Sequence, residues 1–479
     1  MIKKAFTSTL IGCALLLPLP GHAETALPEI GSESFSVITQ QQEYRLGRAW
    51  SRMLRGSAKL YEDALVSQYI EELTWSLVTY SQLNDRRLEI ITLDNGSLNA
   101  FAVPGGIIGI HAGLLLAANS EAELASVISH ELAHLSQRHF AGQLEEQRRN
   151  QPLMLASLLG SILLASASSE GGMVALQSTM AASASSRLSF SRQNEREADY
   201  IGMQTLAASG YDPHAMPEMF SQMQKLARFS RVPPEFLLTH PITQSRISDS
   251  LNRAESFSSV NSRYNSEAFN IAKARIEAHY TDNPKQLLAR YNEVLKKHKN
   301  DDSLRYAVVV AAIAAEDYAL ANKAHTQLSD RFKASLNGRL LQSEISMKQQ
   351  DYSSAAKSLA QLQKLYPDNQ AIRYLYAECM IHLHQPAKAV RNYEYLVNNQ
   401  PNDSRAWYLL AEAYGLNGDI VGVHDARIEF FLLTANIDKA MTQIEYALKE
   451  PGLTNQDKAR FKQRKEEALQ IRKSLEMDF

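Results

Sequence analysis

The chain has 479 residues, of which 45% are hydrophobic, and its formal net charge is −2. This length exceeds one ordinary hydrophobic core, and this composition is too apolar for a disordered protein, so we expect two or three packed domains. The nearly balanced charge supplies no basic excess, and we therefore expect no nucleic-acid partner.

The N-terminus has the layout of an export signal. Two lysines precede an apolar run over residues 5–20, which is followed by a small-x-small site that ends at Ala23. This order predicts a cleavable secretory signal peptide at residues 1–23. The mature protein would then work outside the cytoplasm.

The two cysteines bear on the same question. A lipoprotein cleavage box ending at Cys13 is the less favoured alternative, because the cut would leave apolar residues on both sides of it. Cys379 is then the single cysteine of the exported chain. An intramolecular disulfide is therefore not expected.

The region after the signal peptide is predicted to form helices and then a small sheet. Residues 33–81 carry apolar side chains at helical spacing. The β-rich runs 88–93, 99–103 and 107–110 are separated by Asn-Gly and Pro-Gly-Gly breaks, which predicts a small antiparallel sheet. An open edge of this sheet, at 88–93 or 103–110, would let an extended peptide bind as an added strand.

Two further helices are predicted before residue 210. Ser120 and Glu123 form a capping box, so a helix begins near Glu121 and can run to about Arg148. A second helix is predicted over residues 191–209, where a glycine stops it.

Residues 152–189, between these two helices, are rich in serine, alanine, leucine and methionine. Their apolar part, 153–167, is shorter than the roughly 20 residues that cross a bilayer, so no transmembrane anchor is expected. Three functions stay open for the segment: a cover over a cleft, a peripheral membrane contact, and a grip on a partner. A buried helix fits the composition equally well.

From about residue 263 to the C-terminus, the chain repeats itself at a step of 34 residues. The residue types that recur at this step are Pro367 and Pro401, Tyr374 and Tyr408, Asp317 and Asp351, and Ala321, Ala355 and Ala389. The period resembles that of the tetratricopeptide family, in which stacked helix pairs bury apolar faces that one pair alone cannot cover. A helical bundle without repeats is the alternative.

The run His130-Glu131-Leu132-Ala133-His134 is the central chemical motif. On a helix the two imidazoles lie one turn apart, about 6 Å along the axis, and can hold one metal ion. Glu131 lies about 100° around the helix and can act as general base toward a metal-bound water. Zinc suits this role because it lowers the pKa of such a water toward about 7.

A catalytic zinc needs a third protein ligand. A later histidine after a glycine is excluded, since Gln137 and Phe140 occupy those positions. The other solution is a glutamate on a separate helix, and Glu195 shares a helix face with Asp199 at i, i+4. We expect Glu195 to bind zinc and Asp199 to orient a histidine. Glu197, on the far side of that helix, is expected to face solvent.

These two motifs, together with Asn99-Ala100-Phe101 and Pro104-Gly105-Gly106, resemble the M48 family of zinc metallopeptidases. The resemblance implies one zinc ion on His130, His134 and Glu195, with Glu131 as general base. Zinc-activated water would attack the peptide carbonyl, which makes the chain an endopeptidase.

The implied fold is mainly α. An α+β zincin domain of the gluzincin type, with a small antiparallel sheet, would occupy residues 24–262, and an α-solenoid of tetratricopeptide-like repeats would occupy residues 263–479.

A signal peptide, an M48-type domain and such repeats, in this order, are similar to periplasmic quality-control proteases of Gram-negative bacteria. This similarity implies the periplasm as location and misfolded or stalled outer-membrane β-barrel proteins as substrates. It implies the barrel assembly machinery as partner of the repeats, and a chaperone-like role. A second hypothesis is a scaffold whose repeats do the work while the metal supports structure.

Four more residues have been weighed for the site. His240 matches a further family position and either donates to the oxyanion or takes the fourth zinc position and holds the enzyme latent. The alternative is an ordinary loop histidine. Arg246 pairs with a site carboxylate or the oxyanion, or lies on the surface. His139, about 140° round the helix from His134, and His111 are expected to be structural.

Overall fold

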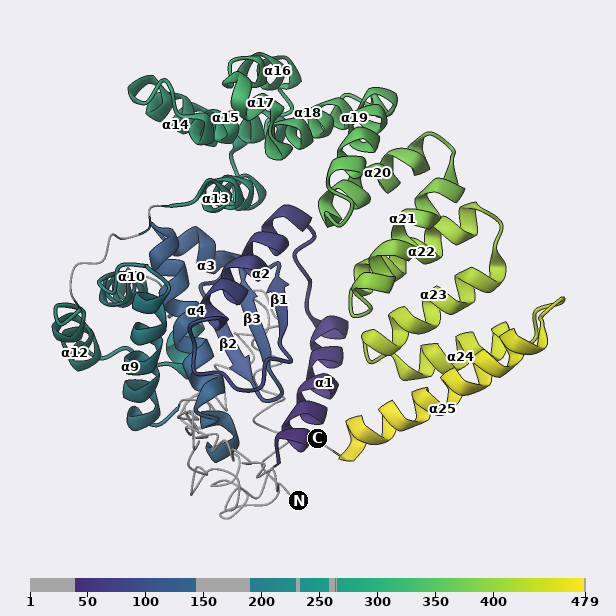
Figure 1. Cartoon of the computed structure of the whole chain (residues 1–479), viewed down its shortest axis with the longest axis horizontal. Coiled ribbons are helices and arrows are strands. Elements are labelled where there is room, and N and C mark those ends of the chain that lie inside the picture. The colour runs from purple at the N-terminus through teal and green to yellow at the C-terminus, as the bar shows by residue number, and fades with distance from the viewer. Residues whose placement is uncertain (1–38, 144–189, 230–232, 258–262, 264, 478–479) are drawn as a thin grey trace, which may run out of the picture. The chain divides into compact units, whose positions relative to one another are not determined.

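The computed structural model describes residues 39–143, 190–229, 233–257, 263 and 265–477 (Figure 1). The predicted signal peptide and residues 152–189 lie outside the described residues. Among the helices of the described part, none combines the length and the apolar character needed to cross a bilayer.

Two helices open the described chain, as the apolar spacing predicted. They are α1 (Gln40–Ser57) and α2 (Ala64–Val78). Thr39 caps α1, and the carboxylate of Asp63 accepts the first free N–H groups of α2. Their apolar faces pack against the sheet and the helices that follow it.

The sheet contains β1 (Glu89–Leu93), β2 (Ala100–Val103) and β3 (Ile107–His111) in the order β1-β3-β2. β2 and β3 are antiparallel, but β1 and β3 are parallel. The prediction of a purely antiparallel sheet is therefore wrong. The tight turn at Gly105 and Gly106, both with φ 78°, joins β2 to β3 as a hairpin, and β3 then inserts beside β1 in the same direction.

This topology also decides which strands have open edges. β3 is central, so its residues within the predicted edge 103–110 are paired on both sides. β1 and β2 are the outer strands. The outer side of β1 is already met by the chain before α2, because Tyr61 N–H donates to the Thr92 carbonyl at 3.0 Å.

The sheet leads through α3 (Ala112–Ala117) into α4 (Glu121–Ser136). Ser120 caps α4 at the predicted position, while the Glu123 carboxylate accepts from Asn119 N–H at 2.6 Å. The prediction that this helix runs to about Arg148 is wrong. It ends at Ser136, and Arg138 then takes a positive φ of 52°, which an α-helix does not allow.

The second predicted helix is α9 (Arg192–Ala208), which Ser191 caps. It crosses α4 at very short range, since a Cβ built on Gly202 would lie 3.0 Å from backbone atoms of His130 and Ser129. Three helices follow: α10 (Ala215–Phe229), the single turn α11 (Phe236–Thr239) and α12 (Gln244–Ala254).

The remaining chain is helical and follows the predicted step. Its helices are α13 (Glu267–Tyr280), α14 (Pro284–Lys297), α15 (Asp302–Ala314), α16 (Tyr318–Thr326), α17 (Asp330–Ala334), α18 (Leu336–Lys348), α19 (Tyr352–Leu365), α20 (Gln370–His382), α21 (Pro386–Asn399), α22 (Ser404–Leu416), α23 (Ile420–Leu433), α24 (Ile437–Ala447) and α25 (Asn455–Met477).

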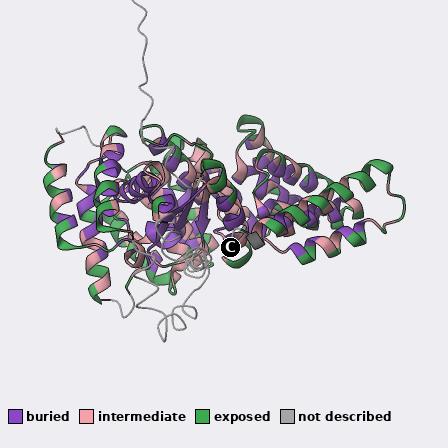
Figure 2. Cartoon of the chain, turned by 90° about the horizontal axis from the view of Figure 1, so that it is seen from below, coloured by how far each residue is buried: buried purple, intermediate pink, exposed green. Residues whose placement is uncertain are grey.

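The 34-residue step has a plain structural meaning. Asp317 and Asp351 are both N-cap residues, of α16 and α19. Ala321, Ala355 and Ala389 are all buried where neighbouring helices touch. Figure 2 shows buried residues along the inner sides of these helices and exposed ones along the outer sides. Helical repeats, rather than a bundle without repeats, form this part of the chain.

The α4–α9 crossing yields a stability prediction. Gly202→Ala places a methyl group against backbone that cannot yield, and we expect it to lower the free energy of unfolding by about 1–3 kcal/mol. Gly415→Ala is the matched control, because its Cβ would meet only Val423 at 3.7 Å. The control should instead stabilise the protein by about 0.5–1 kcal/mol, through helix propensity. Urea unfolding measures both, and equal effects of the two variants would contradict this account.

Candidate metal centre

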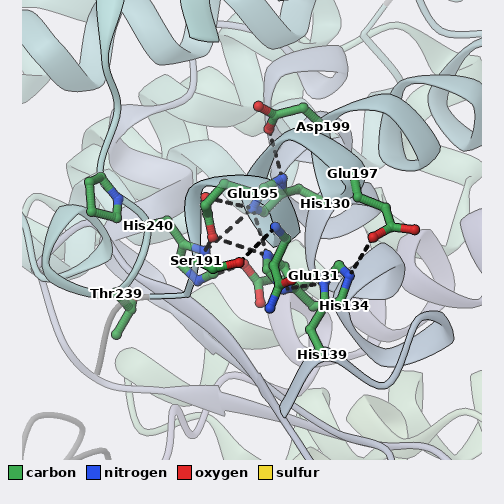
Figure 3. A network of polar contacts seen from close by, with 12 residues as sticks. His130, Glu131, His134, His139, Ser191, Glu195, Glu197, Asp199, Thr239 and His240 are labelled. Carbon is green, nitrogen blue, oxygen red and sulfur yellow. Dashed lines mark hydrogen bonds and ion pairs between the residues drawn. The ribbon is translucent and has the colours of Figure 1, made fainter. Parts of the chain in front are cut away.

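Two imidazoles of α4 point into one buried space (Figure 3). His130 and His134 are separated by one helical turn, and their Nε2 atoms are 3.1 Å apart. Neither side chain is exposed to solvent to any useful extent. Such close imidazoles, without a protein acceptor between them, suit a shared cation.

The first turn of α9 brings a carboxylate to the same space. Glu195 places Oε2 at 3.6 Å from His130 Nε2 and Oε1 at 3.4 Å from His134 Nε2. Burial alone would raise the pKa of Glu195, but His240, His134 and Arg246 outweigh it and hold the pKa well below its usual value. Glu195 is thus an anionic donor in the protein interior.

His240 joins this group from the loop that follows α11. Its Nδ1 atom lies 2.9 Å from Glu195 Oε1 and 3.4 Å from His130 Nε2. Ligand atoms of His130, His134, Glu195 and His240 all lie within 4.8 Å of one another, and all four residues are buried.

These donors fit zinc. Imidazole nitrogens and a carboxylate oxygen are the ligands of zinc sites in peptidases. Burial lowers the pKa of His134 well below its usual value, which keeps its lone pair free for a cation. Burial also opposes protonation of His240, but Glu195 and Glu131 outweigh it and raise that pKa, so this imidazole would release a proton on binding a metal.

Glu131 lies beside the ligand group without belonging to it. Its side chain is 1% exposed, and among the described residues neither carboxylate oxygen has a hydrogen-bond partner. His240 Nε2 is 3.5 Å from Oε1. Burial raises the pKa of Glu131, although the nearby histidines oppose this. A buried carboxylate left without a partner is costly unless the site uses it.

Asp199 contacts the far nitrogen of a ligand histidine. Its Oδ1 atom is 3.1 Å from His130 Nδ1, so it can fix the ring orientation and leave Nε2 for the metal. One turn separates Asp199 from Glu195 on α9, and the structure brings both carboxylates to α4.

Arg246 connects the two carboxylates of α9. Its guanidinium donates to Asp199 through Nε at 2.8 Å and Nη2 at 2.7 Å, and its Nη1 lies 2.5 Å from Glu195 Oε2. Nη1 also donates to the Pro241 carbonyl at 2.9 Å. Arg246 is buried, so its interpretation as a surface residue is wrong. Of its two other roles, pairing with site carboxylates is the one that the structure shows.

His139 is closer to the centre than the helix geometry predicted. Its Nδ1 atom is 3.1 Å from His134 Nδ1, and its Nε2 atom is 3.2 Å from Glu197 Oε2. The predicted orientation away from the metal assumed a continuous helix, whereas α4 ends before this residue. Glu197 itself is about half exposed, as expected.

Two aromatic residues of the site had no sequence signal. Phe190 lies with its ring centroid 4.1 Å from that of His134, and Phe236 stacks on His240 at 4.6 Å. Both are remote in sequence from the histidines that they cover. They exclude water from one side of the centre, which strengthens the electrostatic contacts inside.

The helix pair, the two histidines with the intervening glutamate, and the carboxylate of α9 define a zinc metalloendopeptidase. The chain belongs to peptidase family M48, whose family profile matches residues 64–254. A tetratricopeptide repeat profile matches residues 346–413.

Curated relatives match along the whole chain. The beta-barrel assembly-enhancing protease of Escherichia coli (strain K12) is 33% identical over 475 residues, which covers 98% of this chain and 97% of that protein. The putative beta-barrel assembly-enhancing protease of Vibrio cholerae is 33% identical over 473 residues, 91% of each chain. The mitochondrial metalloendopeptidase OMA1 of Arabidopsis thaliana is 34% identical over 166 residues, 35% of this chain and 31% of that protein.

The contact between Asp199 and His130 predicts a graded effect on metal binding. Asp199→Asn keeps the shape but removes the charge that orients the imidazole, and zinc affinity should fall about 10–100-fold. Glu197→Gln, on the same helix and half exposed, is the control and should leave affinity unchanged. Competition with a chromophoric chelator measures both, and equal affinities would refute the role of Asp199.

Proposed function

We propose that this chain is a periplasmic zinc endopeptidase that degrades misfolded or stalled outer-membrane β-barrel proteins and also assists their assembly. The buried ligand group beside an unpartnered Glu131 carries the enzymatic part of this proposal. The whole-chain similarity to beta-barrel assembly-enhancing proteases supports the substrate class. The signal-like N-terminus supports export.

In this proposal His130, His134 and Glu195 hold the zinc ion, with one ion in each chain. When bound there, zinc polarises the peptide carbonyl and increases the acidity of water. Glu131 takes the proton from the attacking water and passes it to the leaving amine. Its buried carboxylate has no competing hydrogen bond, which supports this role.

Asp199 and Arg246 would position the ligands rather than react. Asp199 aligns His130, and Arg246 fixes Asp199 and one oxygen of Glu195 together. With that oxygen engaged by Arg246, Oε1 is left for the metal. Precise ligand placement matters because small displacements of reacting groups cost large factors in rate.

The outer edge of β2 is the proposed substrate site. In an antiparallel pair, alternate residues direct their backbone groups toward the partner strand and away from it. His111 N–H donates to Asn99 O, so Ala100 and Ala102 direct their backbone groups away from β3. The Ala102 backbone faces Glu131. An extended peptide that pairs with this edge would thus lie beside the base, with little dependence on side-chain sequence.

The repeats are the proposed contact with the barrel assembly machinery. Stacked helix pairs offer an extended surface for a protein partner. A chaperone or scaffold role, independent of hydrolysis, is the second candidate function, and the match of the repeats to the tetratricopeptide profile favours it.

Glu131→Gln separates the two functions. The variant should bind zinc and unfold like the original protein, while hydrolysis of an unfolded barrel protein falls by at least about 10³-fold, because only the base is lost. Zinc analysis and gel-based cleavage measure this. Retained hydrolysis would remove Glu131 from the mechanism. Normal barrel assembly in cells that carry the variant would assign assembly to the repeats.

His240 has two proposed roles, and the geometry favours the restraining one. With His240 added, the metal would have four protein ligands, as in closed structural sites, and no position for water or substrate. His240 Nε2 also lies beside Glu131, so the same imidazole crowds the base. The enzyme would therefore rest in a latent state until the loop moves.

His240→Ala tests latency. Removing the imidazole opens a metal position and frees Glu131, so cleavage of an unstructured protein such as casein should increase at least about tenfold. His214→Ala, a half-exposed histidine on the turn before α10, is the control and should not change the rate. Lower activity of His240→Ala would instead support a role in stabilising the oxyanion.

A further inference from the structure

A second buried polar group lies outside the metal centre and has no part in the proposed chemistry. Glu235 immediately precedes α11, the turn that carries His240 at its end. Asn99 donates from Nδ2 to Glu235 Oε2 at 3.2 Å, and the Ser97 hydroxyl is also bonded to this carboxylate. His111 Nδ1 lies 2.9 Å from Ser97 Oγ and 3.7 Å from Glu235 Oε2. Glu235, Asn99 and His111 are all buried.

This group joins the His240 loop to the start of β2. Asn99 is the residue directly before β2, and Phe236 N–H donates to the Leu98 carbonyl at 3.4 Å. By the alternation along β2, Leu98 directs its backbone groups to the open edge, together with Ala100 and Ala102. The loop therefore occupies the first acceptor of the edge on which the proposed substrate would pair.

The loop has anchors on both sides of His240. Before it, Glu235 is bonded to Asn99 and Ser97, and Phe236 is fully buried in the core. After it, the Pro241 carbonyl accepts from Arg246 at 2.9 Å. Arg246 also serves the metal ligands, so a change there would alter the centre itself. Glu235 is the anchor that can be changed without touching a ligand or its partners.

We propose that Glu235 is a positioning residue that holds the His240 loop closed over the metal centre through its bonds to Asn99 and Ser97. This inference rests on the proposed latent role of His240. It adds the residue that controls the loop, and the competitor that releases it, a peptide strand that takes the backbone acceptors of the β2 edge.

The environment of Glu235 makes this closure sensitive to pH. Burial raises the pKa of Glu235 to about 7, although Ser97 and Asn99 oppose the rise. The one titratable group that faces it among the described residues is His111, whose pKa is lowered by burial to about 3, so this imidazole is neutral and gives the carboxylate no countercharge.

The sign of the effect follows from these values. Glu235 in the closed loop binds a proton more tightly than in an open, solvated loop, where its pKa returns to 4.5. Closure is therefore fully supported below pH 4.5, weakens as the pH rises, and has lost this support above about pH 7. The closed-to-open ratio should fall on the order of 10²-fold across this range.

Hydrogen exchange of residues 233–243 in the full-length protein tests the proposal without reliance on activity. After correction for intrinsic exchange, protection in the original protein should fall at least about tenfold between pH 5 and pH 8. Glu235→Gln, which keeps the shape and acceptor but cannot ionise, should stay protected at both pH values. Glu235→Ala should be unprotected at both. Glu255→Gln, an exposed carboxylate at the end of α12, should behave like the original protein.

Casein cleavage by the zinc-loaded proteins provides the second readout. Glu235→Ala should be more active than the original protein at pH 5, and Glu235→Gln less active at pH 8. Equal pH dependence of exchange in the original protein and Glu235→Gln would overturn the proposal. Activation by His240→Ala with no effect of either Glu235 variant would also overturn it while latency survives. Failure of His240→Ala to activate would remove latency alone, since the exchange data still report on the loop.

Discussion

Arg246 allows two carboxylates to be buried beside three histidines. Glu195 and Asp199 project from the same face of α9 into a space that water does not reach, where an unpaired charge is costly. The planar guanidinium meets both at once, with three donor contacts of 2.5–2.8 Å. It leaves the other side of Glu195 facing the imidazoles. The metal centre, the orientation of His130 and the end of the His240 loop all depend on this one cation.

The surrounding fold is shaped by the need to bring α9 against α4. Gly202 permits the backbones to approach closely at His130, so ligands that lie 65 positions or fewer apart in sequence converge across two helices. The small sheet then places β2 along the same centre, with its free edge beside Glu131. A short helix and two aromatic rings close the remaining side. Metal, base and substrate edge are thus held by regular elements, while the restraint is held by a loop.

This division has a functional consequence. Groups that must keep their geometry are on helices and strands, whose positions are fixed by packing. The group proposed to move, His240, is carried by a segment that is attached at a few polar contacts and one buried ring. A peptidase that shares a compartment with its unfolded clients benefits from such a restraint, because a substrate strand can compete directly for the edge that the loop uses. The repeats would then deliver clients without altering the centre.

The sequence by itself determined the elements whose signal is local. Helical spacing placed His130 and His134 on one face, the Ser191 cap and i, i+4 spacing placed Glu195 with Asp199, and the 34-residue step marked the helical repeats. Only the tertiary structure decided the rest. β3 runs parallel to β1 because of where the hairpin inserts, His139 turns toward His134 because α4 ends early, and Arg246, Phe190 and Phe236 reach the centre from distant segments. Local patterns report the face of a helix, but burial of a charge and the order of strands depend on contacts between segments that no local pattern encodes.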